Sequence, residues 1–311
     1  MGRGPRKRAK AAAAAATQAA ATKETGPEAD AEPSEPAPKK RRRQAEAGEE
    51  SGDEMLTVDR AASRLSRWAE DEAKQQRWLE SRGGGLEGRL EENGASILRL
   101  RDFLPLDMAE CVLTLLKSLP EEAWELSQRS EKEAAQHRFA SADVMDIPQL
   151  APLRSVFWKL LPSLHGEPTL PIFSAGRYGE ADYIGRHDDK AHVPFFDGNT
   201  IYSRTVAAIW YLTKDWDESD GGQLEDLEEG PDDPNRRLVP IFNSLVVFKV
   251  PHWHAVTAVT AKRPRYSIFG WWHQKGKRYD LDASTEGGKA KKPKVIKRRK
   301  KKPMQGAVSA A

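Results

Sequence analysis

Cysteine and long apolar runs are nearly absent from this 311-residue sequence. Cys111 is the only cysteine, which excludes an intramolecular disulfide, a zinc ribbon and a redox-active cysteine pair. No stretch approaches the roughly 20 apolar residues that a membrane-spanning helix needs. The alanine-rich start also has no leucine-rich core of a secretory signal. We therefore expect an intracellular protein with no membrane partner, and not a secreted one.

Large apolar side chains are also scarce at both ends of the chain. Residues 1–55 combine an alanine run with clustered prolines, and ten of the fourteen positions 289–302 are Lys or Arg. Such segments bury too little surface to offset the entropy of ordering. We predict disordered segments at 1–55 and 281–311, a helix and linker at 56–92, and one folded domain at 93–280.

The formal net charge of +3 is unevenly distributed. Residues 1–55 hold eleven Lys or Arg and ten Asp or Glu, and the run at 289–302 adds ten positive charges. Subtracting +1 and +10 from +3 leaves −8 for the residues between, which argues against a groove that follows phosphates. The basic clusters at 36–43 and 297–302 match nuclear import signals. We expect a nuclear or nucleolar protein, otherwise a cytoplasmic one, whose basic tails could associate with RNA or ribosomes.

Short strand-like segments separated by Gly, Asp and Pro turns follow Pro171. Helical patterns at 58–81, 106–116 and 151–163 come before most of them. Helices followed by many short strands predict a mostly β core with supporting helices. The first helix, over 58–81, has only a weak apolar stripe, so we expect it to be peripheral or to bind a partner.

His187 and Asp189 lie two residues apart in one of these strand-like segments, and a strand directs such residues to one face. A second histidine, His252 or His254, follows in the run PHWH. Two imidazoles and one carboxylate leave coordination positions open, which suits Fe(II) oxygen chemistry better than a closed structural zinc site. An inward arginine in the last strand, Arg263 or Arg265, would require a carboxylate partner.

Four segments together resemble the Fe(II)- and 2-oxoglutarate-dependent dioxygenases, and within them the prolyl hydroxylases. They are RYGEADYIGRHDD (177–189), RTVAAIWYLTKDWDESDGGQL (204–224), LVVFKVPHWHAV (245–256) and RYSIFGWWH (265–273). WYLTKDWD with its Gly-Gly is similar to the hypoxia-type intracellular enzymes, and SIFGWWH is similar to hydroxylases of a ribosomal-protein proline. The resemblance covers about 95–280. It implies that 93–280 is a dioxygenase domain with a double-stranded β-helix (jelly-roll) core.

The resemblance also assigns the metal ligands. It implies that His187, Asp189 and His254 bind the metal, because the family's second histidine is followed by x-Val, as in HAV at 254–256. Asp188 alternates to the opposite face and is not a predicted ligand.

A carboxylate site for 2-oxoglutarate is implied in the same way. Arg265 is the predicted partner of the distal carboxylate, with Tyr211 beside it and Tyr178 lining the site. A two-residue insertion relative to the hypoxia-type enzymes leaves Arg263 as an alternative, and either tyrosine could instead be an ordinary core residue.

The resulting expectation is an enzyme that uses Fe(II), 2-oxoglutarate, O2 and ascorbate. It would hydroxylate prolyl residues of an intracellular protein and release succinate and CO2. Two alternatives stay open: a nucleic-acid or histone demethylase of the same superfamily, and a catalytically silent protein that binds nucleic acid or ribosomes. In the loop 190–203, Phe195 and Phe196 could close over a peptide or simply anchor the loop to the barrel.

Overall fold

Helices lead the chain and strands follow in the part that the computed structural model describes, residues 56–94, 96–129, 136–195, 197–228 and 237–281. The helices are α1 (Val58–Glu70), α2 (Glu72–Ser81), α3 (Leu86–Glu92), α4 (Leu106–Ser118) and α5 (Leu153–Leu160). The predicted disordered segment 1–55 and, apart from Leu281, the predicted tail 281–311 lie outside the described residues. Within the described ranges, no helix is long and apolar enough to cross a membrane.

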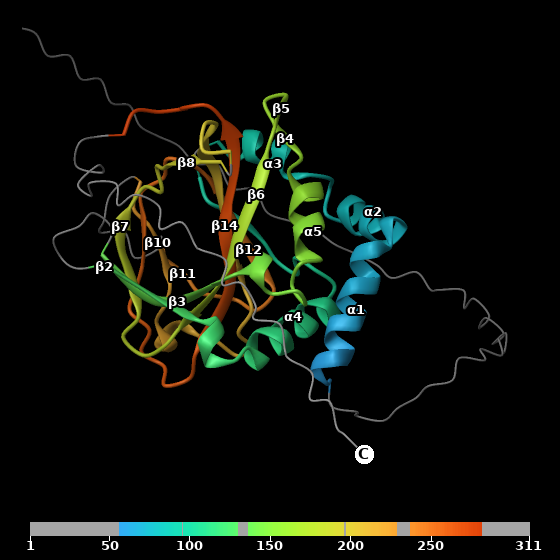
Figure 1. The fold of residues 1–311 in the computed structure, drawn as a ribbon. Coiled ribbons are helices and arrows are strands. Elements are labelled where there is room, and N and C mark those ends of the chain that lie inside the picture. Colours follow the sequence, from blue (N-terminus) through green and yellow to red (C-terminus); the bar gives the residue numbers. More distant parts are fainter. Residues whose placement is uncertain (1–55, 95, 130–135, 196, 229–236, 282–311) are drawn as a thin grey trace, which may run out of the picture. The chain divides into compact units, whose positions relative to one another are not determined.

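The strands form one large antiparallel sheet and a separate short hairpin (Figure 1). They are β1 (Leu98–Leu100), β2 (Glu125–Arg129), β3 (His137–Asp143), β4 (Ser163–Leu164), β5 (Glu167–Pro168), β6 (Leu170–Tyr178), β7 (Tyr183–His187), β8 (His192–Pro194), β9 (Ile201–Tyr211), β10 (Leu224–Asp226), β11 (Arg237–Leu238), β12 (Ser244–Lys249), β13 (His254–Val256) and β14 (Arg265–Lys275). The predicted mostly β core with supporting helices is confirmed.

The large sheet runs in the order β1-β12-β9-β14-β6-β3-β7-β13-β10-β11 and turns at β3. One part of β3, residues 140–143, pairs with β6, and its first two residues pair with β7. A single cavity is lined by β6, β9 and β14 on one side of this turn and by β7 and β13 on the other. The two halves of the sheet therefore face each other across the cavity, as in the expected double-stranded β-helix.

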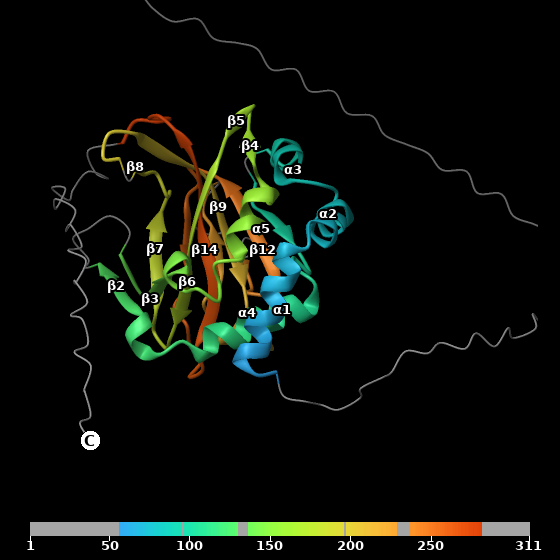
Figure 2. The same ribbon diagram turned by 45° about the vertical axis from the view of Figure 1, so that its right-hand side comes forward.

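Strand β14 shows how the two faces of the sheet are used. Tyr266, Ile268 and Trp272 belong to the apolar core that the helices cover, whereas Arg265 and Trp271 line the cavity. Because a strand directs successive side chains to opposite faces, the residues of RYSIFGWW contribute to both the core and the cavity. Figure 2 shows α1, α4 and α5 gathered on one side of the strands, opposite the half that carries β7.

The segment 58–81 differs from its prediction as one peripheral helix. It breaks at Asp71, which has extended backbone and caps α2 by accepting the Lys74 N–H at 2.9 Å. Leu65, Trp68 and Trp78 are buried in the helix-covered core, and the Trp78 indole N–H donates to the Phe103 carbonyl at 2.7 Å. The prediction of a peripheral helix was wrong, because Ala61, Leu65 and Trp68 form a buried face of α1 and Trp78 continues it on α2.

Candidate metal centre

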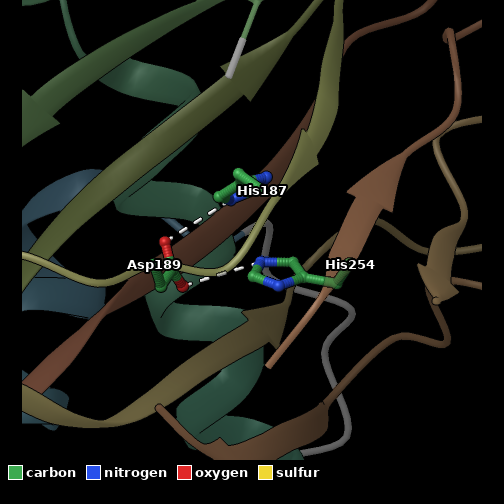
Figure 3. A group of neighbouring side chains, drawn as sticks. All are labelled: His187, Asp189 and His254. Carbon is green, nitrogen blue, oxygen red and sulfur yellow. Dashed lines mark ion pairs between the residues drawn. The ribbon is translucent and has the colours of Figure 1, made fainter. Parts of the chain in front are cut away.

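The three predicted ligands converge on one point at the wall of the cavity. Donor atoms of His187, Asp189 and His254 all lie within 4.8 Å of one another (Figure 3). The sheet register produces this convergence, because His254 on β13 is the direct cross-strand partner of His187 at the end of β7. Residues so paired have side chains close together on the same face.

Asp189 reaches the cluster by a backbone turn and not by continuation of the strand. Strand β7 ends at His187, and Asp189 has a φ of +63°, in the left-handed region that Asp tolerates better than most residues. Its Oδ1 lies 3.4 Å from His187 Nε2 and its Oδ2 lies 3.6 Å from His254 Nε2. Asp188 is buried away from the cluster and pairs with Lys190 at 3.0 Å, so it is not a ligand; the turn, and not strand alternation, separates it from Asp189.

Both imidazoles are held with Nε2 turned toward the carboxylate. His187 Nδ1 donates to the Gly185 carbonyl at 2.8 Å, and His254 Nδ1 donates to the His252 carbonyl at 2.7 Å. A carbonyl only accepts, so each Nδ1 carries a proton, and in the neutral ring each Nε2 has a free lone pair. This arrangement of outer hydrogen bonds is typical of metal-binding histidines.

The electrostatics of the cluster favour the binding forms of Asp189 and His254. For His187, burial lowers the pKa but the contact with Asp189 outweighs burial and raises it. Burial raises the pKa of the Asp189 carboxyl, but His254, His187 and Arg204 outweigh burial and hold that pKa well below its ordinary value. Burial lowers the pKa of His254 to about 4, aided by the neighbouring His187. The carboxylate is therefore ionised and His254 neutral at physiological pH, which is what metal coordination requires.

Arg265 forms a second polar part of the cavity. It is 1% exposed at the start of β14, and its guanidinium lies 4.0 Å from the Tyr178 ring centroid and 5.5 Å from that of Tyr211. Its Nη1 donates to the Gly222 carbonyl, while its Nε has no hydrogen-bond partner. A buried guanidinium with unsatisfied donors is costly on its own, so the site is suited to an incoming carboxylate.

Gly222 makes room for this arginine. Its φ is +62°, and a Cβ at this position would lie 3.2 Å from Arg265 Nη1. A larger residue would meet both backbone strain and the guanidinium. The Gly-Gly pair that carried part of the family resemblance therefore has a local structural role beside Arg265.

The two predicted tyrosines are both fully buried beside Arg265, and only Tyr178 is a cavity-lining residue. Burial raises the pKa of each phenol, and Arg265 partly opposes that rise. The Tyr211 hydroxyl is buried without a hydrogen-bond partner, which leaves a second polar group next to Arg265 that a carboxylate could satisfy.

Neither alternative residue occupies the cavity. His252 is buried, but its Nε2 lies 2.9 Å from Asp226 Oδ1, away from the donor cluster. Arg263 binds the carbonyls of Lys214 and Asp215 and the carboxylate of Asp220 at the surface. The structure thus brings His254 and Arg265 into the cavity in preference to His252 and Arg263.

Arg204 is a cavity residue that sequence reasoning missed. Strand alternation places it with Val206 and Trp210, on the helix-covered face. The register between β9 and β14 shifts, however, since Trp272 pairs with Val206 and the next residue, His273, pairs with Arg204. This bulge at Thr205 turns Arg204 to the cavity side. The sequence RTVAAIW contains no pattern that predicts the bulge.

The remaining lining is largely aromatic and apolar. Phe139 stacks on Tyr178 with ring centroids 4.9 Å apart, and Phe269 packs edge-on against Phe139 at 5.6 Å. The cavity has a volume of about 310 Å³. Phe195 packs against Tyr202 at 5.3 Å and β8 pairs with β9, so of the two alternatives for loop 190–203 anchoring describes this phenylalanine better. Phe196 lies outside the described residues.

Comparison with known proteins agrees with this geometry. Residues 173–273 match the family model of the 2OG-Fe(II) oxygenase superfamily. The prolyl 3-hydroxylase OGFOD1 of Xenopus laevis is 35% identical over 114 residues, which are 34% of this chain and 20% of that protein. The chain therefore spans about a fifth of the length of this curated relative.

Two solved structures share a more distant similarity. A Pseudomonas putida prolyl-4-hydroxylase is 23% identical with a TM-score of 0.42 and covers 61% of this chain and 100% of its own. A Trichoplax adhaerens prolyl hydroxylase, in complex with a hypoxia inducible factor peptide fragment, is 18% identical with a TM-score of 0.46 and covers 70% of this chain and 97% of its own. Residues 173–273, which include His187, Asp189, His254 and Arg265, are therefore similar to the 2OG-Fe(II) oxygenase superfamily.

Proposed function

We propose that the protein is an Fe(II)- and 2-oxoglutarate-dependent dioxygenase that hydroxylates prolyl residues of an intracellular protein. The observation that carries the proposal is the convergence of His187, Asp189 and His254 on one cavity with the buried Arg265. The match of residues 173–273 to the 2OG-Fe(II) oxygenase superfamily and 35% identity with a prolyl 3-hydroxylase over 114 residues support it.

The donor set fits Fe(II). Two neutral imidazole nitrogens and one carboxylate from His187, His254 and Asp189 match the facial set of non-haem iron oxygenases, which leaves positions open for other ligands. When bound there, Fe(II) with 2-oxoglutarate and O2 supplies an oxidation that converts a C–H bond to C–OH and releases succinate and CO2. The three protein residues hold and orient the metal, and none of them acts as a nucleophile.

The neighbouring residues fit the distal carboxylate of 2-oxoglutarate. Arg265 offers a partnerless Nε, and Tyr211 offers a partnerless hydroxyl from the adjacent strand. Both groups are buried, so a carboxylate between them would gain charge-assisted hydrogen bonds in a low-dielectric site. Tyr178 stacks on the guanidinium and fixes its plane.

A prolyl side chain suits the rest of the cavity. Proline has no polar side-chain group, and the walls that Phe139, Phe269 and Trp271 supply are apolar faces on which a pyrrolidine ring can pack. The relative identified as a prolyl 3-hydroxylase supports this substrate class over nucleobases or methylated lysines.

We further propose nuclear or nucleolar residence, contact with RNA or ribosomes through the tails, and the use of ascorbate to sustain activity. The support for the first two is the basic clusters at 36–43 and 289–302. A fluorescent fusion lacking 1–55 and 289–311 should leave the nucleus. Continued nuclear accumulation of that fusion would contradict this part of the proposal.

The test of the activity is incubation of the full chain with proline-containing peptide libraries, Fe(II), 2-oxoglutarate and ascorbate, followed by mass spectrometry. The expected result is the addition of one oxygen to proline, in step with succinate release. Oxidation confined to methylated nucleobases or lysines would favour the demethylase alternative. Failure to turn over 2-oxoglutarate with any substrate would favour the silent binding protein.

A further inference from the structure

Two adjacent tryptophans on β14 place their indole N–H groups on opposite faces of the sheet. Trp272 donates to the Phe157 carbonyl at 3.0 Å in the helix-covered core. Trp271 also donates at 3.0 Å, but its acceptor is Asp189 Oδ2, the carboxylate of the candidate metal cluster. The backbone of β7 has ended before Asp189, so this side-chain contact is a main restraint on the carboxylate.

Arg204 completes the contact from the other side of the indole. Its guanidinium lies 3.4 Å from the Trp271 ring centroid, and its Nη1 is 3.7 Å from Asp189 Oδ1. A cation over the face of tryptophan is attracted by the ring and fixes its plane. Arg204 therefore restrains the indole so that its N–H points at Asp189, and the bulge at Thr205 is what brings Arg204 to this position.

The two oxygens of Asp189 consequently differ. Oδ2 accepts the indole N–H at 3.0 Å, whereas the Arg204 nitrogen nearest to Oδ1 lies beyond hydrogen-bond distance. A carboxylate with one oxygen engaged by a fixed donor cannot turn freely to present both oxygens equally to a metal. Such restraint matters at a site that must keep coordination positions open.

We propose that Trp271 is a positioning residue that holds the Asp189 carboxylate for metal binding, with Arg204 stacked on the indole to orient it. The inference rests on the proposed function, since it assumes that Asp189 is a metal ligand. The predicted role belongs to the indole N–H and not to the aromatic ring as such, which separates it from a role in cavity packing.

The test compares Trp271→Phe with Trp272→Phe in the metal-free full chain. Each change removes one indole N–H that donates at 3.0 Å and leaves an aromatic ring. Mn(II) alone is titrated into each variant by calorimetry, and thermal unfolding is measured without metal. Loss of a partner behind a metal ligand typically weakens metal affinity about 10- to 100-fold, so Trp271→Phe should raise the Mn(II) Kd by that factor with little change in Tm.

The matched control should show the reverse behaviour. Trp272→Phe should lower Tm and leave the Mn(II) Kd within about twofold of wild type, because the Phe157 carbonyl that accepts from Trp272 lies in the helix-covered core. Trp271→His restores a ring N–H and should recover part of the lost affinity. If Trp271→Phe unfolds, Arg204→Met tests the same contact and should weaken Mn(II) binding with the fold kept.

Two failures can be told apart. If wild type binds Mn(II) and the Kd values of Trp271→Phe and Arg204→Met both stay within about twofold of wild type, the positioning role is wrong and the proposed function stands. If wild type does not bind Mn(II), the proposed metal centre is wrong, and the inference falls with it.

Discussion

Strand β14 has one face in the helix-covered core and the other in the cavity, and the two faces satisfy their polar groups differently. On the core side, the Trp272 N–H donates to Phe157. On the cavity side, Arg265 Nε and Ser267 Oγ are buried without a hydrogen-bond partner. Buried polar groups are normally satisfied. The core face is therefore complete within the protein, whereas the cavity face is suited to completion by a ligand.

The largest expected effect of this difference is on metal binding. His187→Ala, Asp189→Ala and His254→Ala should each abolish 2-oxoglutarate turnover while the fold is kept, because two ligands hold Fe(II) far less well than three. Turnover measured by succinate release, with circular dichroism to confirm folding, checks the prediction.

His252→Ala is the control for the ligand series. His252 contacts Asp226 and not the donor cluster, so this variant should retain substantial turnover. An inactive His252→Ala alongside an active His254→Ala would reverse the choice of ligand.

The core face should respond through stability instead. Leu65 on α1 is fully buried in the helix-covered core, and Leu→Ala changes at such sites cost about 2–5 kcal/mol. We expect this loss in the free energy of unfolding in urea, with the Mn(II) Kd unchanged. Ser63→Ala, on the exposed face of the same helix, is the matched control and should change stability little. A loss below about 0.5 kcal/mol for Leu65→Ala would instead support the prediction of a peripheral helix.

Arg265→Ala should act on the cavity face without removing the metal. One charge-assisted hydrogen bond is worth about 1.5–3 kcal/mol, so the 2-oxoglutarate concentration needed for half-maximal rate should rise roughly ten- to hundred-fold. The Mn(II) Kd should stay near that of wild type. Arg263→Ala should leave the co-substrate requirement unchanged, because Arg263 binds surface carbonyls and Asp220. The opposite pattern would show that Arg263 binds the carboxylate.

Much of the site followed from short-range patterns, and the exceptions have physical causes. His187, Asp189, HAV at 254–256 and Arg265 could be named from family resemblance. Strand periodicity did not place Asp189, because β7 ends at His187 and a turn with positive φ brings the carboxylate to the cluster. Arg204 could not be predicted, because a bulge between β9 and β14 reversed its face. The contact between Trp271 and Asp189 also joins residues 82 positions apart through a turn with positive φ, which no local pattern specifies.

The same distinction applies to the fold. The strands after Pro171 were predictable because turn residues separate alternating apolar segments. The break at Asp71 separates α1 from α2, and Trp68 and Trp78 meet edge-on at 5.7 Å across it. Two tryptophans on two separate helices do not have the spacing of one helical stripe, so the sequence pattern did not predict their burial.

The smallest effect concerns pH and the buried His273 near the end of β14. Burial, with Arg204 adding to it, lowers the pKa of His273 to about 4 from an ordinary value of 6.5. The unfolded state therefore binds the proton more readily, and stability is lost as pH falls from 6.5 toward 4. His273→Gln should reduce the loss between pH 7 and 5 by on the order of 1–2 kcal/mol in urea unfolding. If the free energy of unfolding fell equally with pH in wild type and in His273→Gln, the low pKa of His273 would be contradicted.

The most direct test of the central claim, that the cavity face binds a metal and 2-oxoglutarate together, is calorimetric titration of 2-oxoglutarate with and without Mn(II). The account predicts binding that depends on Mn(II), because the co-substrate uses the metal at one end and Arg265 at the other. That binding should be lost in His254→Ala and weakened in Arg265→Ala. Equal binding without Mn(II), or none with it, would contradict the claim.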